Sequence, residues 1–200
     1  MKIIAIVGMP LDLEIGCFGT LYKYVKYGHK VYLMVVGKIN WTEKNLKTLK
    51  KSSKEIGVTE VHHVERFDYS AITQENVNVL RSFIEAIRPS LAILPFIKAA
   101  HLRQKNLAKS SLLACREIEN ILMYEPNMNR NFSPNVYSLI DNEIPVKESC
   151  IEAYARNVSA KKKIKKKMKL LQSYYAQESD LAGPVEAFES HKILLNNDIF

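Results

Sequence analysis

The sequence predicts an α/β fold in which a mostly parallel sheet is covered by helices on both faces. Short apolar runs that suit buried strands occur at residues 3–7, 31–36 and 91–94. Polar residues barely interrupt these runs, which is typical of strands buried on both faces. Segments with helical apolar spacing lie between them, so strand and helix alternate along the chain. We therefore expect parallel strands joined by helical crossovers, in three layers of helix, sheet and helix.

The first strand and the loop after it are the stretch around which the chain is organised. The run at residues 3–7 ends at a glycine, and a polar loop carrying Asp12 and Glu14 follows. Thr20 is expected to cap a helix over residues 21–27. Because reactive groups of parallel sheets gather beyond the carboxyl ends of the strands, a functional site is expected in this loop.

The other elements follow from apolar spacing and from residues that begin or end helices. Thr42 and Thr73 are suited to cap the helices after them, and Pro89 ends the second. His62 and His63 invite a metal interpretation, but adjacent strand residues point to opposite faces, so one buried and one exposed histidine is expected. Further helices are expected at residues 40–56, 73–88, 105–116 and 146–157, and further strands at residues 60–64 and before Glu125.

Length and composition favour a single domain over residues 1–200. Hydrophobic residues make up 47% of the chain and charged residues 25%, as in ordinary globular proteins. No apolar run approaches the roughly 18 residues that a membrane-spanning helix needs. The first strand leaves no room for a signal peptide, and the three cysteines have no metal-like spacing, so a reduced, cytoplasmic setting is expected.

The net charge of +8 comes largely from one segment, because residues 161–169 contain seven lysines. One hypothesis is therefore a binder of nucleic acid or another anionic surface through Lys161–Lys167. No aromatic residues alternate with these lysines, which weakens the case for single-stranded nucleic acid. A solvated, lysine-rich helix face is the preferred interpretation, and nucleic acid is not the expected partner.

The loop after the first strand resembles a family signature. Residues 9–21, MPLDLEIGCFGTL, are similar to the His-Pro-Asp-Asp-x-Glu-x-Gly-x-Gly-Gly-Thr signature of the LmbE-like (PIG-L) zinc de-N-acetylases. In that family the His and the second Asp bind zinc, and the first Asp is the general base. The resemblance places Met9 where the His belongs, Leu11 in place of the general base, and Asp12 at a retained ligand position. Glu14 matches the Glu of the signature.

A second stretch resembles the family's Asp-x-His-x-Asp-His motif. Residues 99–104 read Ala-Ala-His-Leu-Arg-Gln. By this resemblance His101 is the retained candidate for a catalytic role, Arg103 replaces an acid, and Gln104 replaces the third zinc ligand. The residues expected to line the cleft are Met9, Leu11, Asp12, Glu14, His101, Arg103 and Gln104.

Weaker matches continue in the family's order. Lys147 matches the start of a segment that closes in His-x-Ser-Gln, and Tyr154 replaces its His. Residues 185–188, VEAF, resemble the closing Ala-Glu-Ala-Phe of the family domain. The resemblance covers nearly the whole chain and implies the Rossmann-like, three-layer LmbE-like fold.

The substitutions remove the chemistry that a zinc hydrolase needs. A catalytic zinc has about three protein ligands and one open position for water. Asp12 alone, beside the thioether of Met9 and the amide of Gln104, does not make such a set, so no bound metal is expected. Loss of a general base typically costs about 10²–10⁴-fold in rate, and Leu11 cannot take a proton. A buried Asp12 without a metal needs a partner, so contact with Arg103 or His101 is expected.

Three functions follow from this sequence. The preferred one is a non-catalytic relative (a pseudoenzyme) that binds a sugar-like small molecule or a partner, or supports an active paralogue. The first alternative is a carbon–nitrogen hydrolase that removes the N-acetyl group of an amino sugar, with zinc in a rebuilt site. The second is the anionic-surface binder described above. Dinucleotide binding is excluded, because residues 9–19 lack Gly-x-Gly-x-x-Gly. Self-association stays open.

Overall fold

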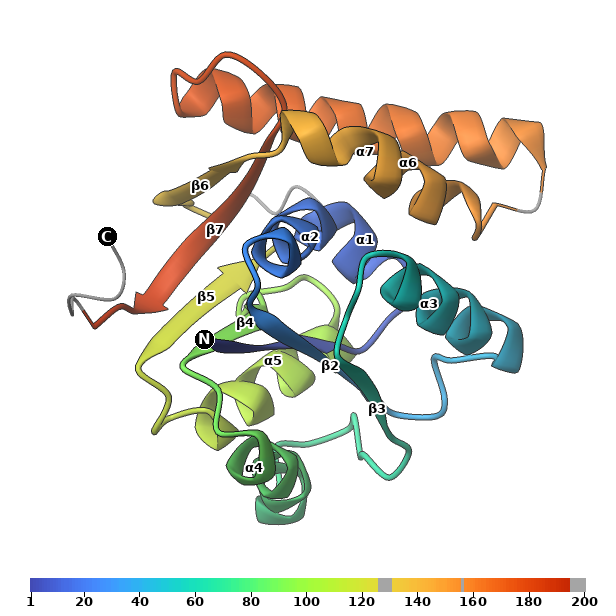
Figure 1. Ribbon diagram of the computed structural model, residues 1–200. Helices are drawn as coiled ribbons and strands as arrows, with labels where there is room; N and C mark the ends of the chain where they lie inside the picture. Colours follow the sequence, from blue (N-terminus) through green and yellow to red (C-terminus); the bar gives the residue numbers. More distant parts are fainter. Residues whose placement is uncertain (126–130, 156, 195–200) are drawn as a thin grey trace.

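The computed structural model describes residues 1–125, 131–155 and 157–194 and contains one seven-stranded sheet, in the order β3-β2-β1-β4-β5-β7-β6 (Figure 1). The first five strands in this order run parallel, and β7 runs antiparallel to both of its neighbours. The strands are β1 Lys2–Val7, β2 Lys30–Val36, β3 Glu60–Val64, β4 Leu91–Pro95, β5 Asn120–Tyr124, β6 Val136–Leu139 and β7 Val185–Lys192. The predicted α/β fold with a mostly parallel sheet is confirmed.

The helices cover both faces of this sheet (Figure 1). They are α1 Asp12–Gly16, α2 Phe18–Lys26, α3 Glu43–Glu55, α4 Gln74–Ile87, α5 Leu102–Ala114, α6 Ile144–Glu152 and α7 Val158–Glu178, with a 3₁₀ turn at Asp141–Glu143 before α6. Residues of β1 alternate between the two apolar cores that result. Ile3 and Ala5 pack with α1, α2 and α3, whereas Ile4 and Ile6 pack with α4 and α5. The three-layer arrangement follows from this alternation.

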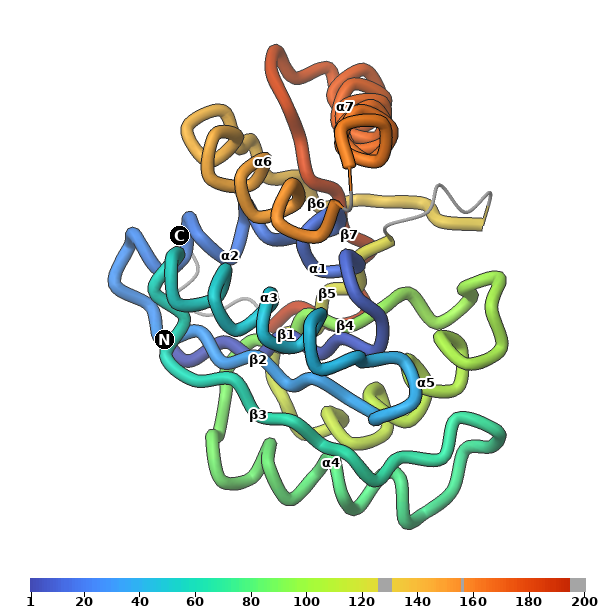
Figure 2. The backbone as a smooth tube through the Cα atoms, turned by 90° about the vertical axis from the view of Figure 1, so that its right-hand side faces the viewer, coloured from blue at the N-terminus to red at the C-terminus, as the bar shows by residue number. Residues whose placement is uncertain are grey.

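Helix α7 forms an additional outer layer on one side of the molecule. Its buried residues Met168, Leu171 and Tyr175 pack against Ile15 of α1 and Ile151 of α6, in a cluster separate from the two sheet cores. Figure 2, turned by 90° from Figure 1, shows α7 beyond α6 and β7, at the far end from α4. No helix of the described ranges is long and apolar enough to cross a membrane.

The structure corrects several element boundaries. The loop that carries Asp12 and Glu14 contains the short helix α1, and Thr20 lies inside α2, which begins at Phe18, instead of capping it. Helix α5 begins at Leu102, three residues before the predicted start at 105. Helix α6 ends at Glu152 and not at residue 157. By contrast, Thr42 and Thr73 cap α3 and α4 as predicted, through hydrogen bonds from Asn45 N and Asn76 N.

The histidine pair of β3 also differs from its prediction. The side chains of His62 and His63 are both partly buried, with 21% and 15% of their area exposed, so neither is fully exposed or fully buried. His62 lies 3.3 Å from Glu60 and stacks against the ring of Phe83. β3 is an edge strand of the sheet, and Val61, His62 and His63 are all of intermediate burial.

Candidate functional site

The strands β1, β2 and β4 are parallel, so their carboxyl ends lie on the same side of the sheet. The loops that follow these ends hold the candidate site. The hydroxyl of Tyr69 donates to the carbonyl of Val36 at 2.6 Å. Asn40 Nδ2 donates to the carbonyl of Gly8, the residue after β1, at 3.1 Å. These bonds fix the end of β1 against the loops after β2 and β3. The residues that follow Gly8 therefore start from a well-anchored backbone.

Leu11 has a backbone conformation that leucine rarely adopts. Its φ of 73° and ψ of −11° lie in the left-handed region, which favours Gly, Asn and Asp. Its half-buried side chain packs against the apolar cluster of α7. The resembled signature has an Asp at this position, so the backbone suits the residue of the signature better than the leucine that is present.

Asp12 begins α1, and its carboxylate is held by Gln104. Gln104 Nε2, in the first turn of α5, donates to Asp12 Oδ2 at 2.6 Å. The pKa of Asp12 is raised to about 7, chiefly by burial and to a smaller extent by the nearby carboxylates of Glu14 and Glu125, while the Gln104 hydrogen bond and the charge of Lys167 act in the opposite direction. Asp12 is therefore poised to change its charge near neutral pH.

The predicted contact of Asp12 with Arg103 or His101 is wrong. Within the described ranges no ion pair joins Asp12 to either residue. Arg103 is exposed and donates through Nη1 to Asn40 Oδ1 at 3.5 Å. His101 is exposed just before α5 and makes no side-chain capping bond. The hydrogen-bond partner of the Asp12 carboxylate is instead the amide of Gln104, the residue that replaces a zinc ligand in the resemblance.

Glu14 is completely buried beside Asp12 and is bound by Tyr154. The Tyr154 hydroxyl, from the segment after α6, donates to Glu14 Oε1 at 2.6 Å. Burial raises the pKa of Glu14 to about 6, and the Tyr154 hydrogen bond lowers it in part. The second carboxylate oxygen, Oε2, has no hydrogen-bond partner among the described residues. The resemblance places Tyr154 at a family His, but no pattern in the sequence predicts this contact.

A buried ion pair supports the site from behind. Lys147 of α6 is 1% exposed, and its ammonium group bonds to Glu186 of β7 and donates to the carbonyl of Ile15 at 2.8 Å. Glu186 also accepts hydrogen bonds from Gly19 N at 2.9 Å and Thr20 N at 2.7 Å, in the first turn of α2. A carboxylate is stabilised by the positive end of a helix dipole. The pair thus ties α6 and β7 to the segment that carries Asp12.

Lys167 of α7 is a member of the site that was not among the predicted cleft residues. Its side chain is half-buried, and its electrostatic neighbours are Asp12 and Glu125. Burial lowers the pKa of Lys167, and the two carboxylates oppose this effect. The spacing of Met168, Leu171 and Tyr175 in the sequence defines the inner face of α7 and could have placed Lys167 at its border.

The residues at this position do not fit a catalytic zinc ion. The described parts of the chain contain no group of three or more His, Cys, Asp or Glu side chains that could hold a metal ion. Met9 offers only a thioether, and the Gln104 amide N–H occupies Asp12 Oδ2. Neither Met9 nor Gln104 can bind zinc as the histidine imidazoles implied by the resemblance would.

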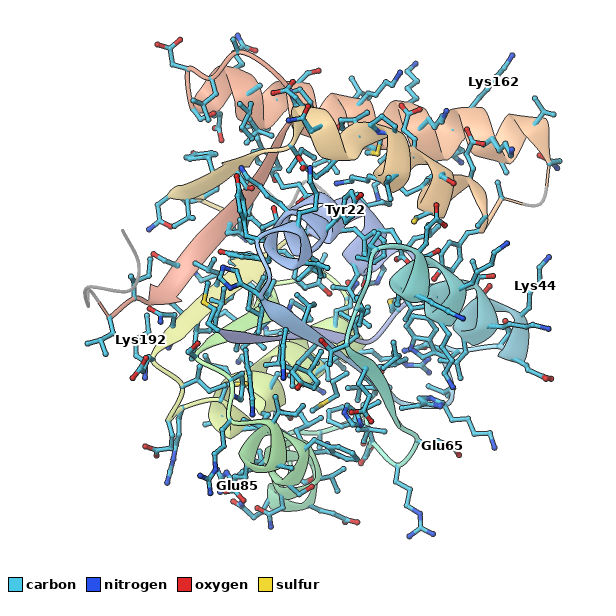
Figure 3. The ribbon with its side chains drawn as sticks, viewed as in Figure 1. Tyr22, Lys44, Glu65, Glu85, Lys162 and Lys192 are labelled. Carbon is cyan, nitrogen blue, oxygen red and sulfur yellow. The ribbon has the colours of Figure 1, made fainter. Side chains whose placement is uncertain are left out.

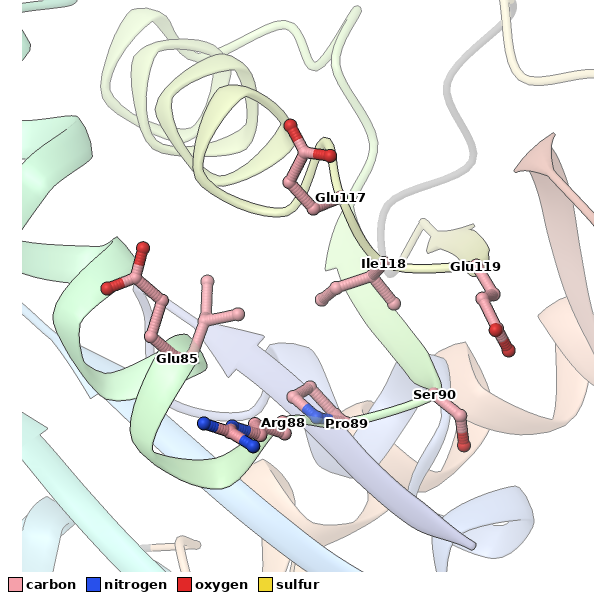
Figure 4. Close-up of a pocket in the computed structure, with 8 residues that line it drawn as sticks. Glu85, Arg88, Pro89, Ser90, Glu117, Ile118 and Glu119 are labelled. Carbon is pink, nitrogen blue, oxygen red and sulfur yellow. The ribbon is translucent and has the colours of Figure 1, made fainter.

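A groove of about 440 Å³ adjoins Arg103 and Tyr69 on the same edge of the sheet. It is lined by Lys38, Ile39, Glu65, Phe67, Asp68, Tyr69, Ser70, Leu102 and Arg103. A larger hollow of about 590 Å³ lies between Arg88 and Glu117, where β4 and β5 begin (Figure 4). That hollow is at the opposite edge of the sheet from Asp12. The smaller groove shares Arg103 and Tyr69 with the candidate site, although Asp12 and Gln104 do not line it.

No protein-family model matches the chain, and no curated protein sequence matches it. Solved structures do match over its full length. The conserved protein TT1542 from Thermus thermophilus is 18% identical, with a TM-score of 0.83, and the match covers 100% of this chain and 98% of that one. N,N'-diacetylchitobiose deacetylase from Pyrococcus horikoshii is 14% identical, with a TM-score of 0.80 and coverage of 100% and 88%.

A third similar structure carries a different activity. The 4-carboxy-2-hydroxymuconate hydratase GalB from Pseudomonas putida KT2440 is 9% identical to this chain, with a TM-score of 0.82 and coverage of 100% and 99%. At these identities the likeness concerns the fold. Because a deacetylase and a hydratase both resemble this chain, the fold alone does not decide the reaction.

Proposed function

We propose, on the premise that this chain has the fold of the LmbE/PIG-L-type de-N-acetylases, that it is a non-catalytic relative that binds a sugar-like small molecule. The binding site consists of Asp12 and Gln104 together with the groove beside Arg103. The proposal goes beyond the fold and rests on the side chains at the end of β1.

The hydrogen bond from Gln104 to Asp12 carries the proposal. At 2.6 Å it satisfies an oxygen of the carboxylate that would otherwise bind a metal ion. In addition, Asp12 is only partly ionised at neutral pH, because burial is the main cause of a pKa of about 7. A carboxylate held by an amide and partly protonated at neutral pH is a poor ligand for zinc. It is, however, a good hydrogen-bonding partner for the hydroxyl groups of a sugar, as donor or acceptor.

The surroundings of Asp12 suit a small hydroxylated molecule. The adjoining groove of about 440 Å³ has the size of small-molecule sites, which span about 300–1,000 Å³. Arg103 adds an exposed hydrogen-bonding group to this groove, with the half-buried Asn40 beside it, and Phe67 and Leu102 add apolar surface. A mixed lining of this kind is typical of sites that hold the polar edge and the apolar face of a ring.

A hydrolase with a rebuilt metal site is the alternative that the fold keeps open. Deacetylases are among the similar structures, and the deacetylase from Pyrococcus horikoshii covers the whole of this chain. Such an enzyme would need a nucleophilic water and a base at neutral pH. Glu14 is an additional carboxylate close to Asp12, but Tyr154 holds one of its oxygens.

Calorimetric titration with N-acetylglucosamine and glucosamine tests the ligand class. We expect the wild-type protein to bind at least one of them and to release no acetate. Gln104→Ala should weaken binding at least about tenfold, because it removes a hydrogen bond to a charged group at the site. Gln74→Ala, an exposed glutamine on α4, is the matched control and should bind as the wild type does. Acetate release that depends on zinc would establish the hydrolase instead, and failure to bind either sugar would contradict the ligand class.

Restoring the missing ligands tests whether the zinc site has been lost. Met9→His combined with Gln104→His should create a set of three ligands with Asp12, and we expect about one zinc ion per chain by elemental analysis. The same double variant carrying Asp12→Ala should bind far less. Stoichiometric zinc in the wild-type protein would refute the proposed loss of the metal.

A further inference from the structure

The lysines of α7 fall into three groups that point in different directions. Lys161, Lys165 and Lys169 face α6 and pair with its carboxylates. Lys165 lies 2.7 Å from Glu148 and 2.6 Å from Glu152, and Lys161 lies 2.9 Å from Glu152. This group serves to hold α7 on α6. Lys167 forms the second group, directed toward Asp12 and Glu125.

The third group faces away from the protein. Lys162, Lys163 and Lys166 are exposed, and none of them forms an ion pair with another residue of the described chain. Figure 3 shows the side chain of Lys162 extending outward from α7, away from every other element. These three positive charges are therefore available to a partner outside the molecule.

Two apolar side chains continue the same face. Leu170 is 54% exposed and Tyr174 is 44% exposed. With Lys162 and Lys166 they form a line in which each residue is four positions after the last, so all four lie on one side of the helix. The hydroxyl of Tyr174 donates to Glu178 at 2.8 Å, which holds the exposed ring in place. The outer face of α7 is therefore basic in its first half, and its second half carries Leu170 and Tyr174, followed one turn later by the exposed carboxylate of Glu178.

The position of α7 suits contact with a flat surface. Figures 1 and 2 show the helix along the outer edge of the molecule, with α6 and the sheet on its inner side. Its 21 residues span about 30 Å. An extended, straight and exposed face of this length can touch a plane over most of its length without hindrance from other helices.

We propose that the outer face of α7 (Lys162, Lys163, Lys166, Leu170 and Tyr174) is a docking surface for membranes that contain anionic phospholipids. Lysines beside such a surface are attracted to its negative potential, while Leu170 and Tyr174 reach the headgroup region. A nucleic acid fits less well. Its phosphates would attract the lysines, but an exposed leucine gains nothing from them, and Tyr174 lies two turns from the nearest of the three unpaired lysines.

Co-sedimentation with lipid vesicles tests the proposal. The wild-type protein should bind vesicles of phosphatidylcholine with 30% phosphatidylglycerol and should not bind vesicles of phosphatidylcholine alone. Replacing Lys162, Lys163 and Lys166 together by Gln should reduce the partition coefficient on the order of 100-fold. The matched control replaces Lys44, Lys47 and Lys51, which are exposed on α3, where no large apolar residue is exposed, and should change binding several-fold less.

A second variant separates lipid from other polyanions. Leu170→Ser should weaken vesicle binding several-fold while retention on duplex DNA stays the same, because only the membrane contacts the leucine. The proposal is overturned if both triple variants lose vesicle binding equally, since net charge alone would then explain it. It is also overturned if the protein binds duplex DNA more tightly than anionic vesicles at the same salt concentration and Leu170→Ser changes neither affinity.

Discussion

Among single side chains, Asp12 and Gln104 show most clearly what can be predicted from residue types and what cannot. The replacement of a ligand histidine by Gln104 follows from the resemblance, and so does the retention of Asp12. Their hydrogen bond does not, because the charge of Arg103 made it the more obvious partner. Helical spacing does not separate the two residues. Gln104 and Arg103 each lie three, four and seven positions before buried residues of α5, so the choice between them depends on how α5 packs.

The raised pKa of Asp12 has a measurable consequence for stability. Its pKa rises from 3.8 in the unfolded chain to about 7, so between these values the folded state binds more protons than the unfolded state. The stability that Asp12 contributes is complete below about pH 4 and is lost as the pH rises toward 7. Asp12→Asn removes this ionisation. We expect the variant to exceed the wild type in free energy of unfolding by roughly 4 kcal/mol at pH 8 and to match it near pH 4.

Urea denaturation at a series of pH values measures this difference. Asp68→Asn is the control, because hydrogen bonds from Ser70 lower the pKa of Asp68 and give its pH dependence the opposite sign. A constant difference between Asp12→Asn and the wild type from pH 4 to pH 8 would show that Asp12 ionises normally in the folded protein.

The elements that could be placed well from the sequence are those with strong apolar patterns. The strands at residues 3–7, 31–36, 60–64 and 91–94 agree with β1, β2, β3 and β4 to within one residue at each end. Helix α1 was missed because its five residues are too few to show a helical period. The end of α1 depends instead on packing against a distant strand, because Tyr124 of β5 lies so close to Gly16 that a Cβ there would clash with its ring.

Because Lys147 and Glu186 join three elements, their removal should be costly. Lys147→Met leaves the carboxylate of Glu186 buried without its counter-charge. We expect a loss of about 3–5 kcal/mol in free energy of unfolding, measured by urea denaturation. Lys147→Met combined with Glu186→Gln should recover part of this loss, since the uncompensated charge is gone.

A surface pair provides the comparison. Lys161→Met breaks the exposed pair with Glu152 and should change stability by less than about 1 kcal/mol. Equal effects of Lys161→Met and Lys147→Met would show that the buried pair has no special role in holding α2, α6 and β7 together.

For the molecule as a unit, strand–helix alternation and the order of the damaged motifs were sufficient to predict the fold. They did not predict the outer layer made by α7. The spacing of Met168, Leu171 and Tyr175 marks the inner face of this helix, but it does not say that α1, α6 and β7 are the elements against which that face packs. The division of its lysines between α6, the Asp12 site and solvent depends on how α7 lies over α6, and no local pattern encodes that placement.

If the fold is held together without a metal ion, a chelator should not affect it. We expect dialysis against EDTA to leave the midpoint of thermal unfolding within about 1 °C of the untreated protein, because removal of a ligand that binds only the folded state would lower it. The histidine double variant described above, loaded with zinc, should by contrast lose stability on the same treatment. A marked fall for the wild-type protein would reveal a resident metal.

The place of β7 in the sheet affects how the protein is made. This strand lies between β5 and β6, although it follows every other strand along the chain. On the ribosome, β6 therefore emerges with no strand to pair with, and Lys147 emerges long before the carboxylate that neutralises it. A nascent chain stalled before residue 185 would expose β6 without its neighbouring strand and Lys147 without its counter-charge. Unpaired strands of this kind promote aggregation and attract chaperones. The sheet therefore cannot be completed before β7 has been synthesised.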